Sequence, residues 1–344
     1  MKKLFVLFVS ILLNTSFLAV FAIGQEKETY MTRTFPASSI KTVETNTLGG
    51  SVAITGNAGS KAVVEVYISH EGWSAERAKQ IFEANYKLDI KVENEKLYVE
   101  VNPKENMKGG KENTVDISIK ISAPKQATTN LKTVGGSISL RDLSGTQNFN
   151  TVGGSLTITN VSGNIDGATT GGSINVTNSG NSIDLKTTGG SIVVADCNGN
   201  ITLSNVGGNT VANGIKGTLK INSMAGSVKL YDISGSVEAG AFNGAMDVKM
   251  TSVSDFVKLS SAGNISLSLP AGKGYNLYAK GKEVETTGLK DFQGTKESDK
   301  IEGIVGKGGP EISITSSMES ESVDKDGNKV NVKTAPEVIR LSFE

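Results

Sequence analysis

Histidine and cysteine, two residue types that carry much of protein chemistry, each occur once in this chain of 344 residues. Catalysis by a Ser-His-Asp or Cys-His arrangement would have to use His70, and no nucleophile with a recognisable motif lies near it. We therefore expect His70 to be structural or to face solvent. Cys197 has Asp196 as its charged neighbour, whereas a reactive thiol needs an electropositive, accessible setting. We expect Cys197 to be a buried thiol that packs as a small hydrophobic residue.

A row of aspartate and asparagine residues recurs every 18 residues and could in principle bind calcium through its side-chain oxygens. Calcium-binding β-rolls need Gly-Gly-x-Gly-x-Asp nonapeptides, which this sequence lacks, and one carboxylate per repeat makes a poor oxygen cage. We expect these side chains to stabilise turns through local hydrogen bonds instead. The row comprises Asp142, Asn160, Asn178, Asp196 and Asp232, with Gly214 in the remaining place.

Enzymatic activity on polysaccharides has little support in the residue pattern. Lyases of this kind use carboxylates with Arg or Lys on one wall, yet residues 133–222 hold only four basic and four acidic side chains. Paired glycosidase carboxylates remain open in segments 69–113 and 319–337, although no spacing marks them. The glycine pairs precede strands and not helices, so they are not phosphate loops. We expect no catalytic residues, no metal ligands and no cofactor.

The repeat itself is the strongest signal in the chain. A glycine pair returns every 18 residues within 133–258, and a second set of glycines lies ten residues after the first glycine of each pair. Self-similarity at a fixed period indicates a repeat architecture. The pairs begin at Gly135, Gly153, Gly171, Gly189 and Gly207, and the second set comprises Gly145, Gly163, Gly199, Gly217 and Gly235, with Asn181 in the place of one glycine.

Apolar residues fall at fixed positions of this unit, which we number from Thr133. Positions 6 and 8 are mostly apolar, as are 15 and 17, and residues two apart share one face of a strand. The period is too short for a strand–helix–strand unit. The sequence therefore predicts coils of two short strands and two corners, stacked in parallel. Glycine would serve corners with positive φ or close approach, and Thr and Ser rows at positions 1 and 5 would bond to them.

The remaining segments define the expected domain organisation. Residues 1–24 have a basic start and an apolar run, which predicts a cleaved signal peptide, with a retained anchor as the alternative. Residues 25–344 form one β-solenoid domain. It includes a helix and hairpin excursion at 69–113, regular coils at 133–258 and a charged insertion at 319–337, expected to protrude as a hairpin or loop. We expect function where the repeat fails: in 69–113, 280–300 or 319–337.

Charge and hydropathy exclude some partners. The formal net charge is +0, whereas nucleic-acid binding needs clustered Lys and Arg, so we expect no nucleic-acid partner. No segment after the first 24 residues is long and apolar enough to span a bilayer. The single cysteine allows no disulfide framework, so stability must come from packing.

The coil sequences resemble a large bacterial family of candidate adhesins, common in Bacteroidetes and of unknown function. The resemblance rests on repeated Thr-Val/Thr-Gly-Gly-Ser-Ile coils, on the 269–277 segment and on the closing 309–314 segment. It covers nearly all of residues 25–344 and implies a parallel β-solenoid of right-handed coils at the cell envelope or outside. It carries over no catalytic residues, and the insertion at 319–337 departs from it.

Three functions remain open. The first is a secreted or surface-associated, non-enzymatic adhesin-like protein that binds a glycan or protein ligand at the cell envelope. The second is a periplasmic scaffold or stress-sensing protein of a Gram-negative envelope, and the third is a polysaccharide-acting enzyme. The sequence does not fix the ligand or the oligomeric state.

Overall fold

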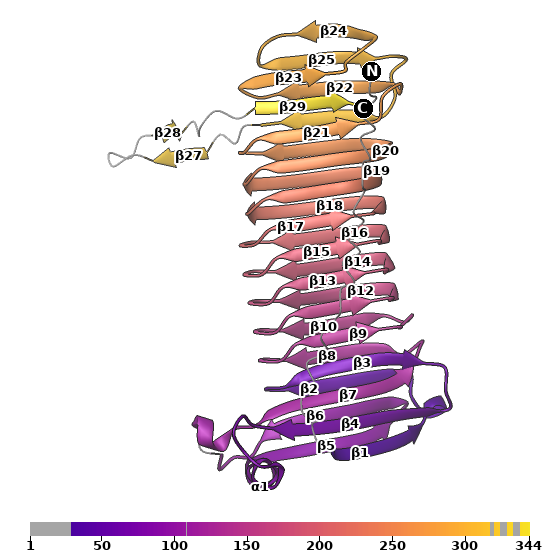
Figure 1. Ribbon diagram of the computed structural model, residues 1–344, viewed down its shortest axis with the longest axis vertical. Coiled ribbons are helices and arrows are strands. Elements are labelled where there is room, and N and C mark those ends of the chain that lie inside the picture. The colour runs from indigo at the N-terminus through magenta and orange to yellow at the C-terminus, as the bar shows by residue number, and fades with distance from the viewer. Residues whose placement is uncertain (1–28, 108, 317–319, 324–328, 333–337) are drawn as a thin grey trace, which may run out of the picture.

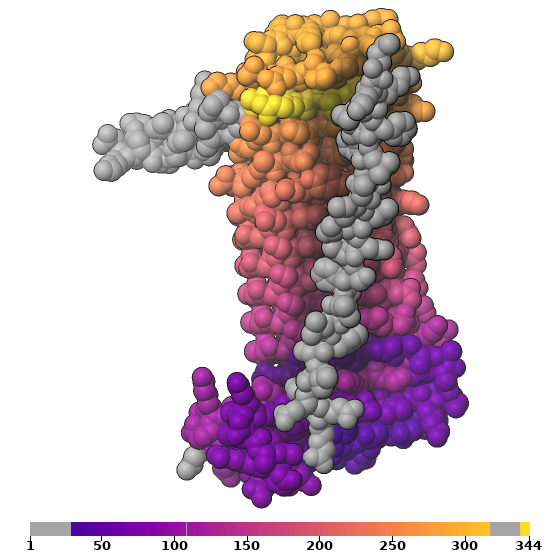
Figure 2. Space-filling view, viewed as in Figure 1, coloured from indigo at the N-terminus to yellow at the C-terminus, as the bar shows by residue number. Residues whose placement is uncertain are grey.

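The computed structural model describes residues 29–107, 109–316, 320–323, 329–332 and 338–344. The predicted signal peptide at 1–24 lies outside these residues. The fold is all-β with one small α-helix and two short 3-10 helices, and 27 strands join in a single sheet. Figure 1 shows this sheet as stacked coils, and Figure 2 shows that they form an elongated body, wider at the N-terminal end.

The middle of the chain consists of coils that pair in parallel at the predicted 18-residue offset. Gln147 pairs with Ile165, for example, and Leu156 pairs with Ile174. Each coil places one strand on each of two walls. The strands are β8 (Thr128–Thr133), β9 (Ile138–Arg141), β10 (Gln147–Thr151), β11 (Leu156–Thr159), β12 (Ser162–Thr169), β13 (Ile174–Thr177), β14 (Gly180–Thr187), β15 (Ile192–Ala195), β16 (Asn198–Asn205), β17 (Thr210–Asn213), β18 (Lys216–Ala225), β19 (Val228–Asn243) and β20 (Met246–Ser261).

The core lies between the two walls and is filled by the apolar rows. Ile174, Val176, Ile183 and Leu185 are all buried, in agreement with the expected rows 6, 8, 15 and 17. Side chains alternate across a strand, so the residues between them face solvent. Burial of these stacked aliphatic rows is the main stabilising term of the coils.

The N-terminal part extends the stack with strands of mixed direction. It contains β1 (Thr29–Pro36), η1 (Ala37–Ser39), β2 (Thr42–Thr47), β3 (Ser51–Asn57), β4 (Lys61–Ser69), α1 (Ala75–Asn85), β5 (Tyr86–Glu93), β6 (Lys96–Pro103), η2 (Lys111–Asn113) and β7 (Asp116–Pro124). The predicted helix is present as α1, and Ser74 caps it by accepting a hydrogen bond from the Arg77 backbone N–H. The predicted hairpin joins β5 and β6, with Asn94 and Glu95 at positive φ.

The C-terminal part also mixes directions. It contains β21 (Ile265–Leu269), β22 (Tyr275–Lys280), β23 (Glu283–Thr287), β24 (Phe292–Lys296), β25 (Lys300–Val305), β26 (Glu311–Thr315), β27 (Ser320–Val323), β28 (Lys329–Val332) and β29 (Val338–Phe343). Within the charged insertion, β27 and β28 pair as an antiparallel two-stranded sheet separate from the main one. Figure 1 shows this hairpin projecting from the stack.

The expected purely parallel fold needs correction at both ends. β4 pairs antiparallel with β1 and β7, β5 with β6, and β25 with β22 and β24. A parallel stack ends in unpaired strand edges and exposed core, which need a cover. Here hairpins fold back over the last coils and supply that cover.

The chain also enters and leaves the stack out of sequence order. β2 lies between β6 and β8, and β3 lies between β7 and β9. At the other end, β26 lies between β20 and β22, and β29 lies between β21 and β23. Both the first and the last coil-forming segments are therefore held inside the stack.

Glycine serves the two kinds of corner differently. The second glycine of each pair allows close approach: a Cβ on Gly172 would lie 2.0 Å from the Gly154 carbonyl oxygen. The second set adopts positive φ, as at Gly163 and Gly199, and Asn181 also adopts positive φ, as its place in the repeat predicted.

Candidate binding surface

The residues first considered for chemistry do not converge on a site. The His70 ring stacks on Trp73 at a centroid distance of 3.8 Å, and its Nδ1 lies 2.8 Å from the Glu71 carbonyl oxygen. Cys197 is buried, its thiol donates to the Ala195 carbonyl oxygen, and burial raises the pKa of this thiol. His70 lies on the N-terminal excursion and Cys197 in the core of the regular coils, so the two belong to different parts of the fold.

The aspartate and asparagine row occupies corners in the left-handed backbone region. Asp142, Asn160, Asn178, Asp196 and Asp232 all have φ between 50° and 57°. The Asn160 side-chain amide donates to the Asp142 carboxylate one coil away. These residues therefore act as turn formers. Among the residues that the structure describes, no group of three or more His, Cys, Asp or Glu side chains is arranged to hold a metal ion.

A hollow of about 500 Å³, which we call the polar hollow, lies on one wall of the stack. It crosses five neighbouring strands in the order β6, β2, β8, β10 and β12. At a strand spacing of about 4.8 Å these five strands span roughly 20 Å. Its outward-facing lining consists of Glu44, Asn46, Glu100, Asn130, Lys132, Asn148, Asn150 and Asp166.

Strand register arranges this lining in two ladders. In the first, Glu44 is followed by Asn130, Asn148 and Asp166 on successive strands. In the second, Glu100 is followed by Asn46, Lys132 and Asn150. The first ladder is partly linked internally, because the Asn148 amide donates to the Asn130 side-chain oxygen at 3.0 Å. The Lys96 ammonium lies 2.8 Å from a Glu44 carboxylate oxygen beside it.

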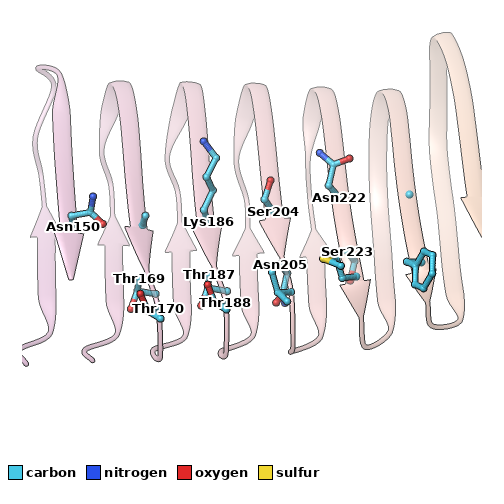
Figure 3. Close-up of a pocket in the computed structure, with 15 residues that line it drawn as sticks. Asn150, Thr169, Thr170, Lys186, Thr187, Thr188, Ser204, Asn205, Asn222 and Ser223 are labelled. Carbon is cyan, nitrogen blue, oxygen red and sulfur yellow. The ribbon is translucent and has the colours of Figure 1, made fainter. Parts of the chain in front are cut away.

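A second hollow of about 610 Å³, the apolar hollow, continues along the same wall from Asn150. Its floor and one side differ in chemistry. Polar residues on successive strands form the floor, whereas corner residues at position 2 form the side. Figure 3 shows the floor residues Asn150, Lys186, Ser204 and Asn222 and the corner residues Thr170 and Thr188. Val206, Met224 and Phe242 extend the corner row.

Sequence analysis directed attention to the wrong part of the chain, because both hollows lie on the wall that the regular coils build. The signal was available in the period of two along each second strand. Positions 15, 17 and 1 face inward, so positions 16, 18 and 2 must face outward. Position 2 was easily taken for core because it holds Val, Met and Phe. The structure instead buries the threonines of position 1, such as Thr151 and Thr169.

No helix in the described part of the chain is long and apolar enough to cross a membrane. The helix α1 contains 11 residues.

Comparison with known proteins yields no family model and no curated protein that matches the chain. Solved structures do match at low identity. A candidate lipid-binding protein from Parabacteroides distasonis is 14% identical, with 91% of this chain and 96% of that chain covered and a TM-score of 0.38. A candidate adhesin from Bacteroides fragilis is 12% identical, with coverage of 92% and 97% and a TM-score of 0.28. A candidate cell adhesion protein from Clostridium sporogenes is 12% identical, with coverage of 92% and 100% and a TM-score of 0.19. At these identities and scores the likenesses support no functional inference, and the chain's own surface must supply it.

Proposed function

We propose that this protein is a non-enzymatic, adhesin-like binding protein that holds an uncharged linear glycan along the polar hollow. The observation that carries this proposal is the pair of amide-rich ladders on neighbouring parallel strands. A side-chain amide both donates and accepts hydrogen bonds, which matches a sugar hydroxyl. Ladders that run across successive strands suit a ligand that is itself extended and periodic.

The charges of the polar hollow favour an uncharged glycan over an acidic one. Three carboxylates, Glu44, Glu100 and Asp166, line it together with one ammonium group, that of Lys132. Like charges across a binding surface disfavour a ligand. A polymer of uronic acids should therefore bind less tightly than a neutral polymer of the same length.

Direct binding measurements test this proposal. We expect calorimetric titration with neutral linear oligosaccharides to show affinity that rises with length up to about the 20 Å span of the hollow. The double variant Asn46→Ala/Asn150→Ala should bind about tenfold more weakly, because each lost hydrogen bond costs about 0.5–1.5 kcal/mol. Asn175→Ala is the matched control, since Asn175 is an exposed asparagine of β13 on the opposite wall. Equal loss in the control, or tighter binding of acidic glycans, would contradict the assigned site.

The non-enzymatic part of the proposal has its own test. Prolonged incubation of the protein with each bound oligosaccharide should leave the oligosaccharide intact by mass spectrometry. Any cleaved product would overturn it and favour a polysaccharide-acting enzyme.

We also propose a secreted or cell-surface location, with residues 1–24 removed as a signal peptide. The motivation is the basic start and apolar run of that segment. Protease treatment of intact cells should degrade the protein if it lies at the surface. Strictly periplasmic recovery would favour the scaffold or stress-sensing role instead.

At the level of the fold, we propose a right-handed β-solenoid whose parallel coils are closed at both ends by antiparallel strands. The parallel 18-residue registers of β8 to β19 support the solenoid assignment. An experimental density map that shows left-handed coils would overturn the assigned hand.

A further inference from the structure

A line of exposed side chains runs along one edge of the stack, where each coil turns after its second wall. We call it the corner ridge. Its members follow the paired residues Thr47, Thr133, Thr151, Thr169, Thr187, Asn205, Ser223 and Ala241, so they stack on successive coils. In order along the stack they are Leu48, Val134, Val152, Thr170, Thr188, Val206, Met224 and Phe242.

The corner ridge exposes far more apolar surface than a solvated strand edge requires. Its six large apolar side chains are between 42% and 58% exposed, and they include most of the exposed large hydrophobic residues in the described chain. Seven steps of about 4.8 Å give the ridge a length of roughly 34 Å. The glycine pair that follows each ridge residue leaves this line raised above its surroundings. A contiguous exposed apolar patch of this kind marks an interaction surface.

The order of residues along the corner ridge is symmetric about its centre. Three apolar residues precede Thr170 and Thr188, and three apolar residues follow them. The large side chains Met224 and Phe242 stand at one end, whereas the smaller Leu48 and Val134 stand at the other. A surface that meets itself around a twofold axis must be self-complementary in this way.

We propose that the corner ridge is the interface of an antiparallel homodimer. The twofold axis passes between Thr170 and Thr188, so each of these threonines faces the other one in the second copy. Moving outward, Val152 meets Val206, Val134 meets Met224, and Leu48 meets Phe242. The ridge of each copy enters the apolar hollow of the other, whose side is formed by the same corner residues.

Charges beside the corner ridge agree with the antiparallel arrangement. The neighbouring outward row contains two lysines, Lys132 on β8 and Lys186 on β14. Under the proposed axis Lys132 lies opposite Asn222, and Lys186 lies opposite Ala168. A parallel arrangement would place each lysine opposite its own copy, and like charges in register are costly.

The buried area is sufficient for a specific dimer of modest affinity. Covering the six apolar side chains removes on the order of 500 Å² per copy, or about 1,000 Å² in total, near the lower limit for a biological interface. The polar hollow has no ridge residue in its lining and stays open in the dimer. The inference is therefore independent of the proposed glycan binding, and Asn46→Ala/Asn150→Ala should leave dimerisation unchanged.

Sedimentation equilibrium of the purified protein over a range of concentrations tests the dimer. The parent should sediment as a dimer, and Val206→Glu/Met224→Glu should remain monomeric at concentrations at least about tenfold higher, because each buried unpaired carboxylate is strongly unfavourable. Val193→Glu is the matched control, since Val193 is 40% exposed on the opposite wall, and it should dimerise like the parent. A parent that is monomeric at every concentration, or a control that loses the dimer equally, would overturn the proposal.

Disulfide cross-linking tests the orientation. Val134→Cys and Met224→Cys, mixed and oxidised, should give a covalent dimer because these positions meet across the axis. Either variant alone should not cross-link, since its two copies of one position lie about 24 Å apart. The native Cys197 is buried and does not compete. Efficient cross-linking of Val134→Cys alone would overturn the antiparallel arrangement.

Discussion

Threonine hydroxyls inside the glycine-pair corners stabilise the repeat at the scale of single residues. The Thr187 hydroxyl donates to the Gly172 carbonyl oxygen at 2.7 Å and accepts from the Gly190 backbone N–H at 3.2 Å. Thr151 and Thr169 make the same two bonds in their own coils. The expected hydroxyl row at position 1 is thus confirmed as a link between successive corners.

Thr210 is the contrasting case, because its buried hydroxyl has no hydrogen-bond partner within the described structure. It occupies position 6, where the adjacent coils hold Ile192 and Val228. Thr210→Val should raise the free energy of unfolding by about 1 kcal/mol, because an unsatisfied buried hydroxyl is removed at constant shape. Thr187→Val should lower it by about 1–3 kcal/mol, since two backbone partners lose their bonds. Urea unfolding of both variants measures the difference, and equal signs would contradict the assignment.

Cys197 predicts a pH dependence of stability. Burial raises the pKa of its thiol above the ordinary value of 9.0, so the folded chain holds this proton more tightly than the unfolded chain. The thiol's contribution to stability is therefore full below pH 9.0 and falls as the pH rises through the raised pKa. Cys197→Val imitates Val161, which holds the same place in another coil. The stability of the parent relative to this variant should decline between neutral and strongly alkaline pH, and a constant difference would contradict a buried thiol.

At the scale of the element, the two glycines of one pair have different duties. A Cβ on Gly172 would meet the Gly154 carbonyl oxygen at 2.0 Å, whereas a Cβ on Gly171 would meet the Val152 carbonyl oxygen at an ordinary 3.5 Å. Gly172→Ala should therefore destabilise the protein by about 1–3 kcal/mol or more, through overpacking against fixed backbone. Gly171→Ala should change the melting temperature little. Similar effects of the two substitutions, measured by thermal unfolding, would show that spacing between coils does not set the requirement.

The sequence predicts these elements well because the period repeats the same physical signals in every coil. Rows 6, 8, 15 and 17 place the core, and Asn181 at positive φ fits its place in the repeat. The polar hollow could not be predicted, because β2 and β6 enter it through a register that no 18-residue offset encodes. Thr47 pairs with Thr133, for instance. Exposure of the corner ridge was predictable from the alternation along the strand, although its apolar composition masked it.

At the scale of the whole molecule, the chain order at the C-terminal end makes the last strand a structural insert. β29 separates β21 from β23, and its buried Ile339 and Leu341 pack into the core. The strands between them in sequence, β22 to β25, reach past this place and depend on its being filled. Because parallel pairing joins residues far apart in sequence, the end of the stack forms only after its last segment has been added.

Removal of β29 should therefore damage the end of the stack more than its length suggests. A chain that stops after residue 316 loses two buried aliphatic side chains, worth about 3–6 kcal/mol, and leaves β21 and β23 with unpaired edges. We expect faster proteolysis within 270–310 and a lower melting temperature. The matched control replaces residues 319–337 with a short glycine-containing corner and keeps β29, so every strand pairing of the main sheet survives. This control should melt like the parent. A truncated chain as resistant to protease as the control would show that the terminal coil closes without its inserted strand.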